Sequence, residues 1–432
     1  MKRSTRTKKP SSANTKSKKA RKRGASTALR SRTKPAAALP RLSALEQSRS
    51  QPVLIVAGEE SGDILGGAIV REVLKKRKLS LWGCGGRRMA EAGMEIFYPA
   101  EKLATIGFWE AAKNYRRLSK IVTQLVDKAV ATNTKEAWLI DFPGFNILLA
   151  KKLKERGIRS TLIVSPTVWA WKYNRVFKIR ERFERVLCLY DFEPGIYEKI
   201  GVEAHYIGHP LTAETAVFKS KIARTGNPLK KVPALREVFR KKQPLIAILP
   251  GSRPAEIHHH TARILAGVRE FQKKHSGYAF VLPAANEKIH KLLAAYELPP
   301  DTYLTEFSAR YVLSTATAAI ACSGTVTLEC ALFGVPHLIL YRSSWLSYAI
   351  FKGIIRIPYI GMVNVLAGKF IVPEYLQYAL KPANIAAELE KILDDDAYRA
   401  TQKAELKKIA ARLTAYEPAK QAARILTEKL SF

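Results

Sequence analysis

The sequence predicts an α/β protein made of two doubly wound domains in tandem. Short apolar runs alternate with helical patterns from residue 52 onward, the alternation pauses once near the middle of the chain, and it then restarts. Continuous apolar strands separated by helices are typical of a parallel sheet that is covered on both faces. A chain of 432 residues also has the length of two ordinary domains rather than one.

The first half of the chain holds five apolar runs with helical patterns between them. Strands are predicted at 53–57, 79–82, 137–141, 161–165 and 186–190, and helices at 63–77, 116–131 and 146–156. A polar stretch at 212–242, which contains Gly226, Pro228 and Pro233, then interrupts the pattern. Clusters of polar residues with Gly and Pro are typical of loops, so we expect the domain boundary in this stretch.

The second half repeats the arrangement and ends in helices. Strands are predicted at 245–249, 279–282, 318–322 and 337–341, and helices from about residue 382. The expected organisation is therefore a tail at 1–50, one domain at 51–215 and a second domain at 216–432. In such a pair the carboxyl ends of the strands face one another across a cleft, where a nucleotide-bearing ligand would bind.

Positive charge is the unusual feature of the composition. The chain has 73 Lys and Arg against 37 Asp and Glu, a net charge of +36. Residues 1–50 alone hold 16 Lys and Arg against one acid, Glu46, and show almost no aliphatic periodicity, so we expect a disordered basic tail. Such charge attracts nucleic acid, an anionic membrane or phosphorylated substrates. Nucleic-acid binding is disfavoured because the tail has no aromatic residue among its cations.

The cysteines and the hydropathy pattern bear on the compartment. Cys84, Cys188, Cys322 and Cys330 lack the spacing of a metal site or a disulfide framework, so we expect them to be reduced and buried. No stretch of 18 uncharged apolar residues exists, and the basic amino terminus lacks the apolar segment of a secretory signal. A cytoplasmic or peripherally membrane-bound protein is expected.

Three motifs in the first half follow predicted strands. Gly58–Asp63 opens a helix whose free N–H groups could bind an anion or a hydroxyl; the alternative is an ordinary turn capped by Ser61 or Asp63. Asp141 ends a strand before a Pro-Gly break, where ligands bind in this fold, and could instead be a helix cap. Trp169 and Trp171 follow the next strand and could be core residues or could line an acyl or sugar pocket.

Two further motifs lie in the second half. Pro250–Arg253 and Ser323–Glu329 each follow a strand and begin a helix. Small residues let the backbone approach phosphates, and Arg253 adds a cationic fork. Glu329 lies one turn into its helix, where it could accept hydrogen bonds from a ribose. Two such loops in one domain indicate a site that binds a diphosphate.

Two clusters imitate metal sites. His258–His260 are consecutive, so their side chains point in different directions on a helix; a solvated or phosphate-facing basic surface is expected instead. Asp394–Asp396 lie at the end of a helical pattern away from any strand, which favours a polar turn. No metal and no cofactor is predicted.

Eight strings, in this order, carry a resemblance to a known family: AGEESGD, GCGGRRM, IDFPGFN, VSPTVWAW, IGHPL, LPGSR, SGTVTLE and NVLAG. From about residue 52 to the carboxyl end, the chain resembles the lipid-A-disaccharide synthases. The resemblance implies a GT-B fold and an inverting, metal-independent transfer. UDP-2,3-diacylglucosamine would be the donor, and 2,3-diacylglucosamine 1-phosphate (lipid X) would be the acceptor that receives the β-1,6 bond as UDP leaves.

The resemblance also implies roles for individual residues. The family's proposed base falls on Asp141, its diphosphate-binding arginine on Arg253 and its uridine-site acid on Glu329. The other positions expected near the donor are Glu59, Ser61, Ser252, Ser323, Gly324, Thr325 and Asn364. The chain departs from the family at Gly144, where a second acid is usual, and at Arg87, where proline is usual. Asp141 is therefore the only acid of its motif.

Two segments are expected to contact the membrane or the acyl chains. Residues 103–118 and 345–365 mix aromatic and aliphatic residues with cations, a combination that suits an interfacial surface; the alternative is a plain amphipathic helix. The residues concerned are Phe108, Trp109, Arg116, Arg117, Phe351, Lys352 and Arg356. Together with the family resemblance, this implies attachment to the cytoplasmic face of the inner membrane. Acyl-chain length, the exact sugar and homodimer formation stay open.

The same fold admits other readings of the chemistry. A different UDP-sugar enzyme, such as a 2-epimerase or another glycosyltransferase, is the nearest alternative. A basic nucleic-acid-binding protein is a remote one, supported only by charge.

Overall fold

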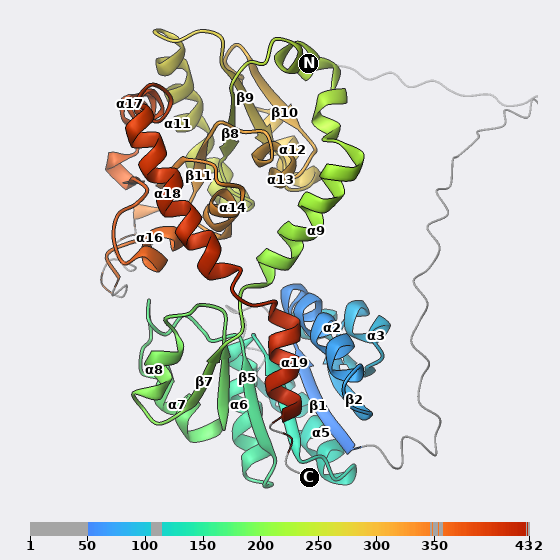
Figure 1. Cartoon of the computed structure of the whole chain (residues 1–432). Coiled ribbons are helices and arrows are strands. Elements are labelled where there is room, and N and C mark those ends of the chain that lie inside the picture. Colours follow the sequence, from blue (N-terminus) through green and yellow to red (C-terminus); the bar gives the residue numbers. More distant parts are fainter. Residues whose placement is uncertain are drawn as a thin grey trace, which may run out of the picture. The chain divides into compact units, whose positions relative to one another are not determined.

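The computed structural model describes residues 51–104, 115–345, 348, 353, 357–428 and 430. These residues form two Rossmann-like domains, each with one parallel sheet and covering helices (Figure 1). The first sheet has seven strands in the order β3-β2-β1-β4-β5-β6-β7, and the second has six in the order β10-β9-β8-β11-β12-β13. The predicted fold class is confirmed. The predicted tail lies outside the described residues.

The first sheet and its helices occupy the chain up to Tyr206. The strands are β1 Gln51–Ala57, β2 Leu79–Gly85, β3 Glu95–Pro99, β4 Glu136–Ile140, β5 Arg159–Ile163, β6 Arg185–Cys188 and β7 Glu203–Tyr206. The helices are α2 Glu60–Leu74, α3 Arg87–Glu91, α4 Ala100–Ala104, α5 Tyr115–Ala131, α6 Pro143–Lys154, α7 Arg175–Arg182 and α8 Pro194–Glu198.

The second sheet follows a helical connection. Its strands are β8 Leu245–Leu249, β9 Ala279–Pro283, β10 Thr302–Thr305, β11 Ala318–Cys322, β12 His337–Tyr341 and β13 Glu374–Leu376. The α-helices are α9 Pro210–Thr225, α10 Arg236–Arg240, α11 Pro254–Gln272, α12 Glu287–Ala294, α13 Ala309–Leu313, α14 Thr325–Phe333, α16 Met362–Ala367, α17 Pro382–Asp394, α18 Asp396–Leu413 and α19 Pro418–Glu428. Short 3₁₀ turns lie at Pro228–Lys231, Pro233–Leu235 and Gln377–Ala379.

The expected polar boundary at 212–242 is mostly helical, which differs from the sequence prediction. His209 accepts a hydrogen bond from Leu211 N on its Nδ1 atom (3.2 Å), and Pro210 occupies the first turn, so the IGHPL string starts α9. Phe218 anchors the helix by packing edge-on against Tyr311, with ring centroids 4.7 Å apart. Because only a few apolar residues of α9 pack inward, its sequence looks like a loop.

The order of the strands fixes where ligands can bind. In the first sheet the strands after β1 are added on one side of it up to β3, and the chain then crosses to the other side, where β4 pairs with β1. In the second sheet the same crossing places β11 beside β8. In open parallel sheets the crevice at such a switch point, beyond the carboxyl ends of the strands, is the usual ligand site. Four of the predicted motifs follow these four strands: Gly58–Asp63, Asp141, Pro250–Arg253 and Ser323–Glu329.

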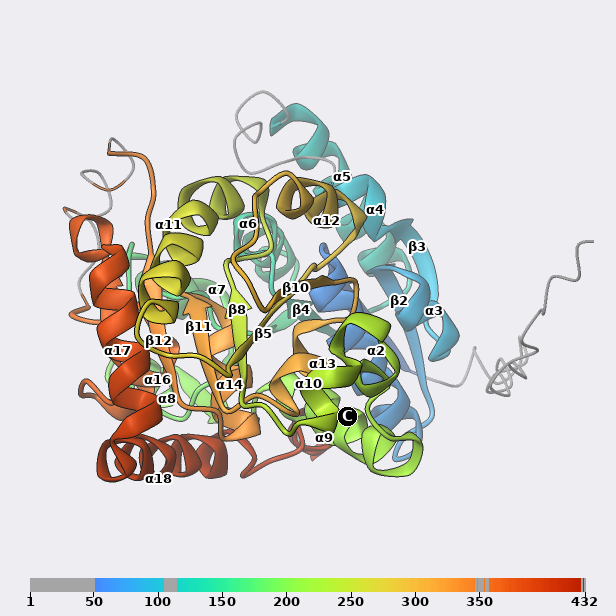
Figure 2. The ribbon, with the colours of Figure 1, turned by 90° about the horizontal axis from the view of Figure 1, so that it is seen from above.

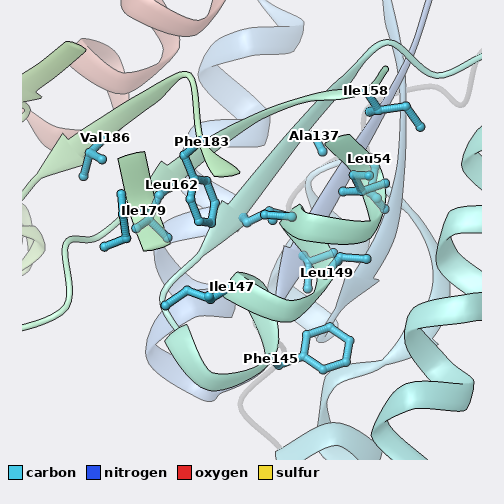
Figure 3. Packing of buried hydrophobic residues seen from close by; sticks show 14 of the residues in the cluster. Leu54, Ala137, Phe145, Ile147, Leu149, Ile158, Leu162, Ile179, Phe183 and Val186 are labelled. Carbon is cyan, nitrogen blue, oxygen red and sulfur yellow. The ribbon is translucent and has the colours of Figure 1, made fainter. Parts of the chain in front are cut away.

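Apolar packing holds α6 and α7 against one face of the first sheet. Phe145, Ile147 and Leu149 of α6, Ile179 of α7 and the strand residue Leu162 belong to one buried cluster, part of which Figure 3 shows. Removing such side chains typically costs about 2–5 kcal/mol each. This packing fixes the two loops that precede α6 and α7.

The helices at the carboxyl end serve both sheets. Helix α17 lies beside α11, where Gly267 lets Ile385 approach (Figure 2). Helix α19 lies instead beside α2 of the first sheet, and its Ala422 and Leu426 are buried in that core (Figure 1). The domain limits expected from the sequence stay a prediction.

All four cysteines are free and buried, as predicted. Among the residues that the structure describes, no helix is both long enough and apolar enough to cross a membrane.

Candidate active site

A cavity of about 580 Å³ opens beyond the carboxyl ends of β8 and β11. Six of the predicted site residues line it: Ser252, Arg253, Ser323, Gly324, Thr325 and Glu329. Leu211, the last residue of the IGHPL string, also lines it, and residues outside every predicted motif complete it: Pro283, Ser308 and Arg310, among others. Helices α11 and α14 both begin at this cavity, so their amino-terminal N–H groups offer an anion site.

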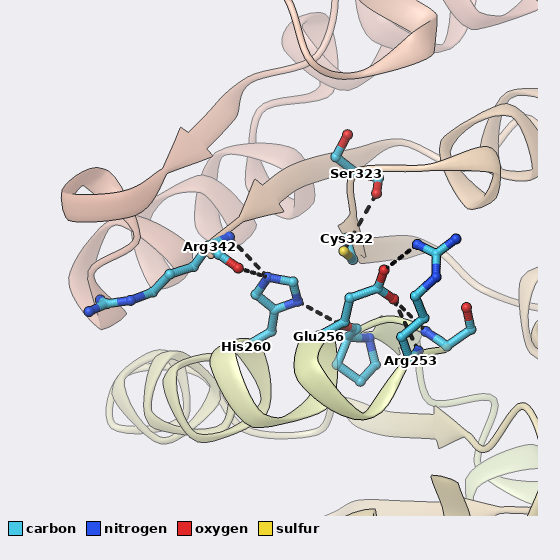
Figure 4. Close-up of polar contacts among 8 residues, drawn as sticks. Arg253, Glu256, His260, Cys322, Ser323 and Arg342 are labelled. Carbon is cyan, nitrogen blue, oxygen red and sulfur yellow. Dashed lines mark hydrogen bonds and ion pairs between the residues drawn. The ribbon is translucent and has the colours of Figure 1, made fainter. Parts of the chain in front are cut away.

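The Pro250–Arg253 loop is held in shape by Glu256 (Figure 4). The Glu256 carboxylate accepts hydrogen bonds from Ser252 N (2.8 Å) and Arg253 N (3.2 Å), and its other oxygen pairs with Arg253 Nη1 at 2.8 Å. Gly251 has a φ of 129°, and a Cβ there would lie 2.5 Å from Glu256 Cβ, so this position requires glycine. The Arg253 side chain is 80% exposed, which leaves its guanidinium accessible to a ligand.

Glu329 belongs to a three-membered ionic chain. Arg310 Nε donates to Glu329 Oε1 at 2.7 Å, and Arg310 Nη2 donates to Glu214 Oε2 at 2.6 Å. Burial raises the pKa of Glu329, which Arg310 opposes. Arg310 thus orients the carboxylate at the cavity wall, and Glu214 reaches it from α9.

Asn364 does not reach the cavity, in contrast to the expectation for a donor-binding residue. It is fully buried, its Nδ2 donates to Val372 O (2.7 Å) and Glu374 Oε1 (2.8 Å), and its Oδ1 accepts from Val372 N (3.0 Å). Glu374 in turn accepts from Ile360 N (3.0 Å), and the Ile360 carbonyl accepts from Ser323 Oγ (2.8 Å). Asn364 therefore supports the cavity through Ser323 instead of facing it.

His260 is a correction to the expected basic surface at 258–260. It is fully buried and its Nδ1 lies 2.7 Å from Pro250 O, while its Nε2 lies 2.9 Å from Arg342 N (Figure 4). Burial lowers its pKa. A neutral ring that donates from Nδ1 and accepts at Nε2 fits these two partners. His260 therefore ties the Pro250–Arg253 loop to the end of β12.

Asp395 and Asp396 have local roles at a helix start. Asp395 caps α18 by accepting from Tyr398 N at 2.8 Å, and Asp396 pairs with Arg399 one turn on.

Asp141 and Glu59 lie together at the switch point of the first sheet and are not among the residues lining the cavity. Burial raises the pKa of Asp141, and burial followed by the charge of Asp141 raises the pKa of Glu59. Asp141 and Phe142 both have positive φ, 50° and 45°. Non-glycine residues with this backbone are uncommon and cluster at functional sites.

The structure does not have the helix caps that were the alternative interpretation of the Asp141 and Gly58–Asp63 motifs. Helix α6 begins at Pro143 and its N-cap residue is Phe142, so Asp141 precedes the cap. Helix α2 has Glu59 as N-cap, and Ser61 is exposed on its first turn. Asp63 caps a different helix, α3, by accepting from Gly86 N (2.7 Å), Arg88 N (3.0 Å) and Met89 N (3.2 Å).

The departures from the family pattern are accommodated locally. A Cβ at Gly144 would meet nothing within 4 Å, so the position has room for the acid that this chain lacks. Arg87 is the first residue of α3, a position that proline also suits. Gly58 matters more, because a Cβ there would lie 2.6 Å from the Phe142 ring, next to Asp141.

Glu193 is a buried acid that no motif indicated. Its side chain accepts from Trp169 Nε1 (3.1 Å) and Tyr190 N (3.2 Å), and Trp169 packs edge-on against Phe192. Burial raises the pKa of Glu193 to about 7. The carboxylate anchors the loop that carries Trp169, so this tryptophan has a structural partner beside the sheet edge.

Replacing Glu193 by Gln is expected to change the pH dependence of stability. Because the native pKa is raised to about 7, the folded state holds this proton longer than the unfolded state, and rising pH costs stability. The free energy of unfolding of the variant relative to the wild type should therefore increase by about 2–3 kcal/mol between pH 5 and pH 8. Urea unfolding at both values measures this. Glu198→Gln, an exposed neighbour on α8, is the control and should show no such trend.

The predicted membrane residues are only partly within the described chain. Phe108, Trp109, Phe351, Lys352 and Arg356 lie outside it. Arg116 and Arg117 are exposed at the start of α5.

Comparison with known proteins gives a consistent result. The profile of the family described as "Lipid-A-disaccharide synthetase" matches residues 53–426. The chain is 35% identical to the lipid-A-disaccharide synthase of Anaeromyxobacter dehalogenans strain 2CP-1 over 84% of this chain and 93% of that protein. It is 34% identical to that of Geobacter sulfurreducens over 89% and 99%.

Solved structures share the fold at low identity. The glycosyltransferase of kitacinnamycin superposes with a TM-score of 0.60 at 15% identity, covering 89% of this chain and 100% of that one. A UDP-GlcNAc 2-epimerase from Neisseria meningitidis, bound to UDP-GlcNAc, superposes with a TM-score of 0.54 at 14% identity, covering 88% and 99%. These likenesses show the fold alone.

Proposed function

Because the chain belongs to the lipid-A-disaccharide synthetase family, we propose that this glycosyltransferase joins UDP-2,3-diacylglucosamine to 2,3-diacylglucosamine 1-phosphate. The products are the β-1,6-linked disaccharide 1-phosphate and UDP. The family match over residues 53–426 carries the proposal, and the cavity at the starts of α11 and α14 supports it, because its helix termini and Arg253 suit a diphosphate.

The reaction divides between the two switch points. Asp141 removes the proton from the acceptor's 6-hydroxyl as that oxygen attacks the anomeric carbon of the donor. Arg253 and the starts of α11 and α14 stabilise the charge that develops on the departing UDP. Glu329, oriented by Arg310, accepts hydrogen bonds from the ribose, and Glu59 lies beside the base.

The experiment that tests the function is direct. The purified protein is incubated with UDP-diacylglucosamine and the lipid acceptor, and the products are followed by mass spectrometry. Stoichiometric UDP and a disaccharide 1-phosphate are expected. Formation of a 2-epimer of the donor sugar with no disaccharide would favour the epimerase alternative.

We further propose that the enzyme binds the anionic cytoplasmic face of the inner membrane. Both substrates carry acyl chains, and a cationic cluster precedes the predicted contact segment 345–365. Burial lowers the pKa of His259, and the neighbouring His258, Arg342 and Arg263 lower it further. No carboxylate lies within 4.0 Å of Arg263 or Arg342 in the described part of the chain. Unneutralised cations of this kind attract anionic lipid.

Changing Phe108 and Trp109 together to Ser is expected to shift the protein from the membrane to the soluble fraction. Loss of two inserted aromatic side chains removes the favourable free energy of their transfer from water into the membrane, roughly 1.5–3 kcal/mol for each. Flotation with anionic vesicles measures the shift, and thermal melting checks folding. Unchanged flotation of a folded variant would contradict the contact at 103–118.

A further inference from the structure

One pair of cations near the first sheet has no role in the reaction described above. Lys172 Nζ lies 4.6 Å from the centroid of the Trp171 ring, and the Arg175 guanidinium carbon lies 5.2 Å from it. The indole is itself fixed, because Trp171 Nε1 donates to Thr167 Oγ1 at 3.0 Å. Cations stacked on one anchored ring are held in position before any ligand arrives.

Arg175 is the more informative of the two. Its side chain is half-buried, and burial lowers its pKa. No hydrogen bond or ion pair links its guanidinium to another described residue, and the first turn of α7, which it begins, contains no acid. A partly desolvated guanidinium without an anionic partner is costly in a folded protein. A ligand that brings the anion would remove that cost.

The place of the pair is set by the sheet. Strand β5, which leads into the Val164–Asn174 loop, runs beside β4 with Ile163 opposite Ile140, and Asp141 N donates to Ile163 O at 2.8 Å. The loop therefore leaves the sheet at the same edge as Asp141. Helix α7 is fixed there by packing on α6 and by the Arg182 Nη1 bond to Ile147 O (3.1 Å).

We infer that Arg175, stacked on Trp171 with Lys172 beside it, binds the phosphate of the acceptor sugar. The inference rests on the proposed function, in which the acceptor carries a 1-phosphate and offers its 6-hydroxyl to Asp141. These two groups are separated by the width of one sugar ring, so their sites must lie on one edge without touching.

The test compares two acceptors with several variants. Wild type, Arg175→Ala, Arg175→Gln and the control Arg180→Ala, an exposed cation of the same helix, are assayed with the acceptor and with the same lipid lacking its phosphate. Arg175→Ala should raise the acceptor KM by roughly 10–100-fold, the value of a charge-assisted contact, with kcat and the donor KM nearly unchanged. On the phosphate-free lipid it should equal the wild type. Arg175→Gln covers the case in which the alanine variant fails to fold.

The outcomes separate the inference from the proposed function. A wild type that transfers sugar, combined with equal losses on both acceptors or no loss on either, would overturn the phosphate site alone. If the wild type transfers to neither acceptor, the proposed function fails, and calorimetric binding of the two lipids still tests the site without turnover. In that case the wild type should bind the phosphorylated lipid more tightly than the phosphate-free lipid, and Arg175→Ala should bind the two lipids equally. Equal affinity of the wild type and Arg175→Ala for the phosphorylated lipid would overturn the inference.

Discussion

Replacing Asp141 by Asn is expected to lower turnover by about 10²–10⁴, the usual contribution of a general base. The substitution suits the backbone, because Asp141 has a φ of 50° and Asn is among the residues that best tolerate this region. Asp141 precedes the N-cap of α6, so the loss cannot come from an uncapped helix. UDP affinity should be unchanged, since Asp141 is not among the residues that line the cavity.

The pH profile gives this prediction a second readout. Burial raises the pKa of Asp141, so turnover of the wild type should fall with decreasing pH at a pH above the ordinary Asp value of about 3.9. The Asn variant should lack that fall. Asp301→Asn is the matched control, an exposed aspartate with a φ of 51° far along the chain. Near-normal turnover of Asp141→Asn would show that Asp141 is not the general base.

The strands at the centre of each sheet could be predicted from sequence because they are continuous apolar runs. The predictions for β8, β11 and β12 match the observed bounds. The short strands β3, β7, β10 and β13 were missed; they have only three to five residues, and several of those residues are not fully buried. A strand that is buried on both faces needs apolar residues at every position and so appears in the sequence as a continuous apolar run. These four strands are not buried on both faces, so their sequences lack such a run.

The cavity was predictable only where its residues follow strands. Arg253 and Glu329 belong to motifs at strand ends, and the topology brings them together. Arg310 and Glu214 lie outside every motif that the sequence offers, and only the folded chain places them beside Glu329. Asn364 shows the opposite limit, because a motif position does not tell whether its side chain faces the ligand or supports a residue that does.

Replacing Arg253 by Ala is expected to weaken UDP binding by about 10–100-fold and to reduce turnover as well. A charge-assisted contact to phosphate is worth about 1.5–3 kcal/mol in binding, and a donor aimed at developing charge typically contributes about 10²–10³ in kcat. Stability should change by no more than about 0.5 kcal/mol, because the side chain is 80% exposed. The loop should also keep its shape, since Glu256 would still accept from the backbone of Ser252 and residue 253.

Matched variants decide whether the effect belongs to the cavity. Arg240→Ala removes an arginine that pairs in the same i, i+3 way with Glu237 (Nε to Oε1, 2.9 Å) but does not line the cavity, and it should leave UDP affinity unchanged. Arg253→Lys keeps the charge without the planar fork, so its loss should be intermediate. Calorimetry with UDP and initial-rate measurements give both quantities. If Arg253→Ala binds UDP as tightly as the wild type, Arg253 does not contact the diphosphate in the ground state. A lowered kcat alone would then mean that the guanidinium acts in the transition state, because an interaction made only there changes turnover without changing affinity.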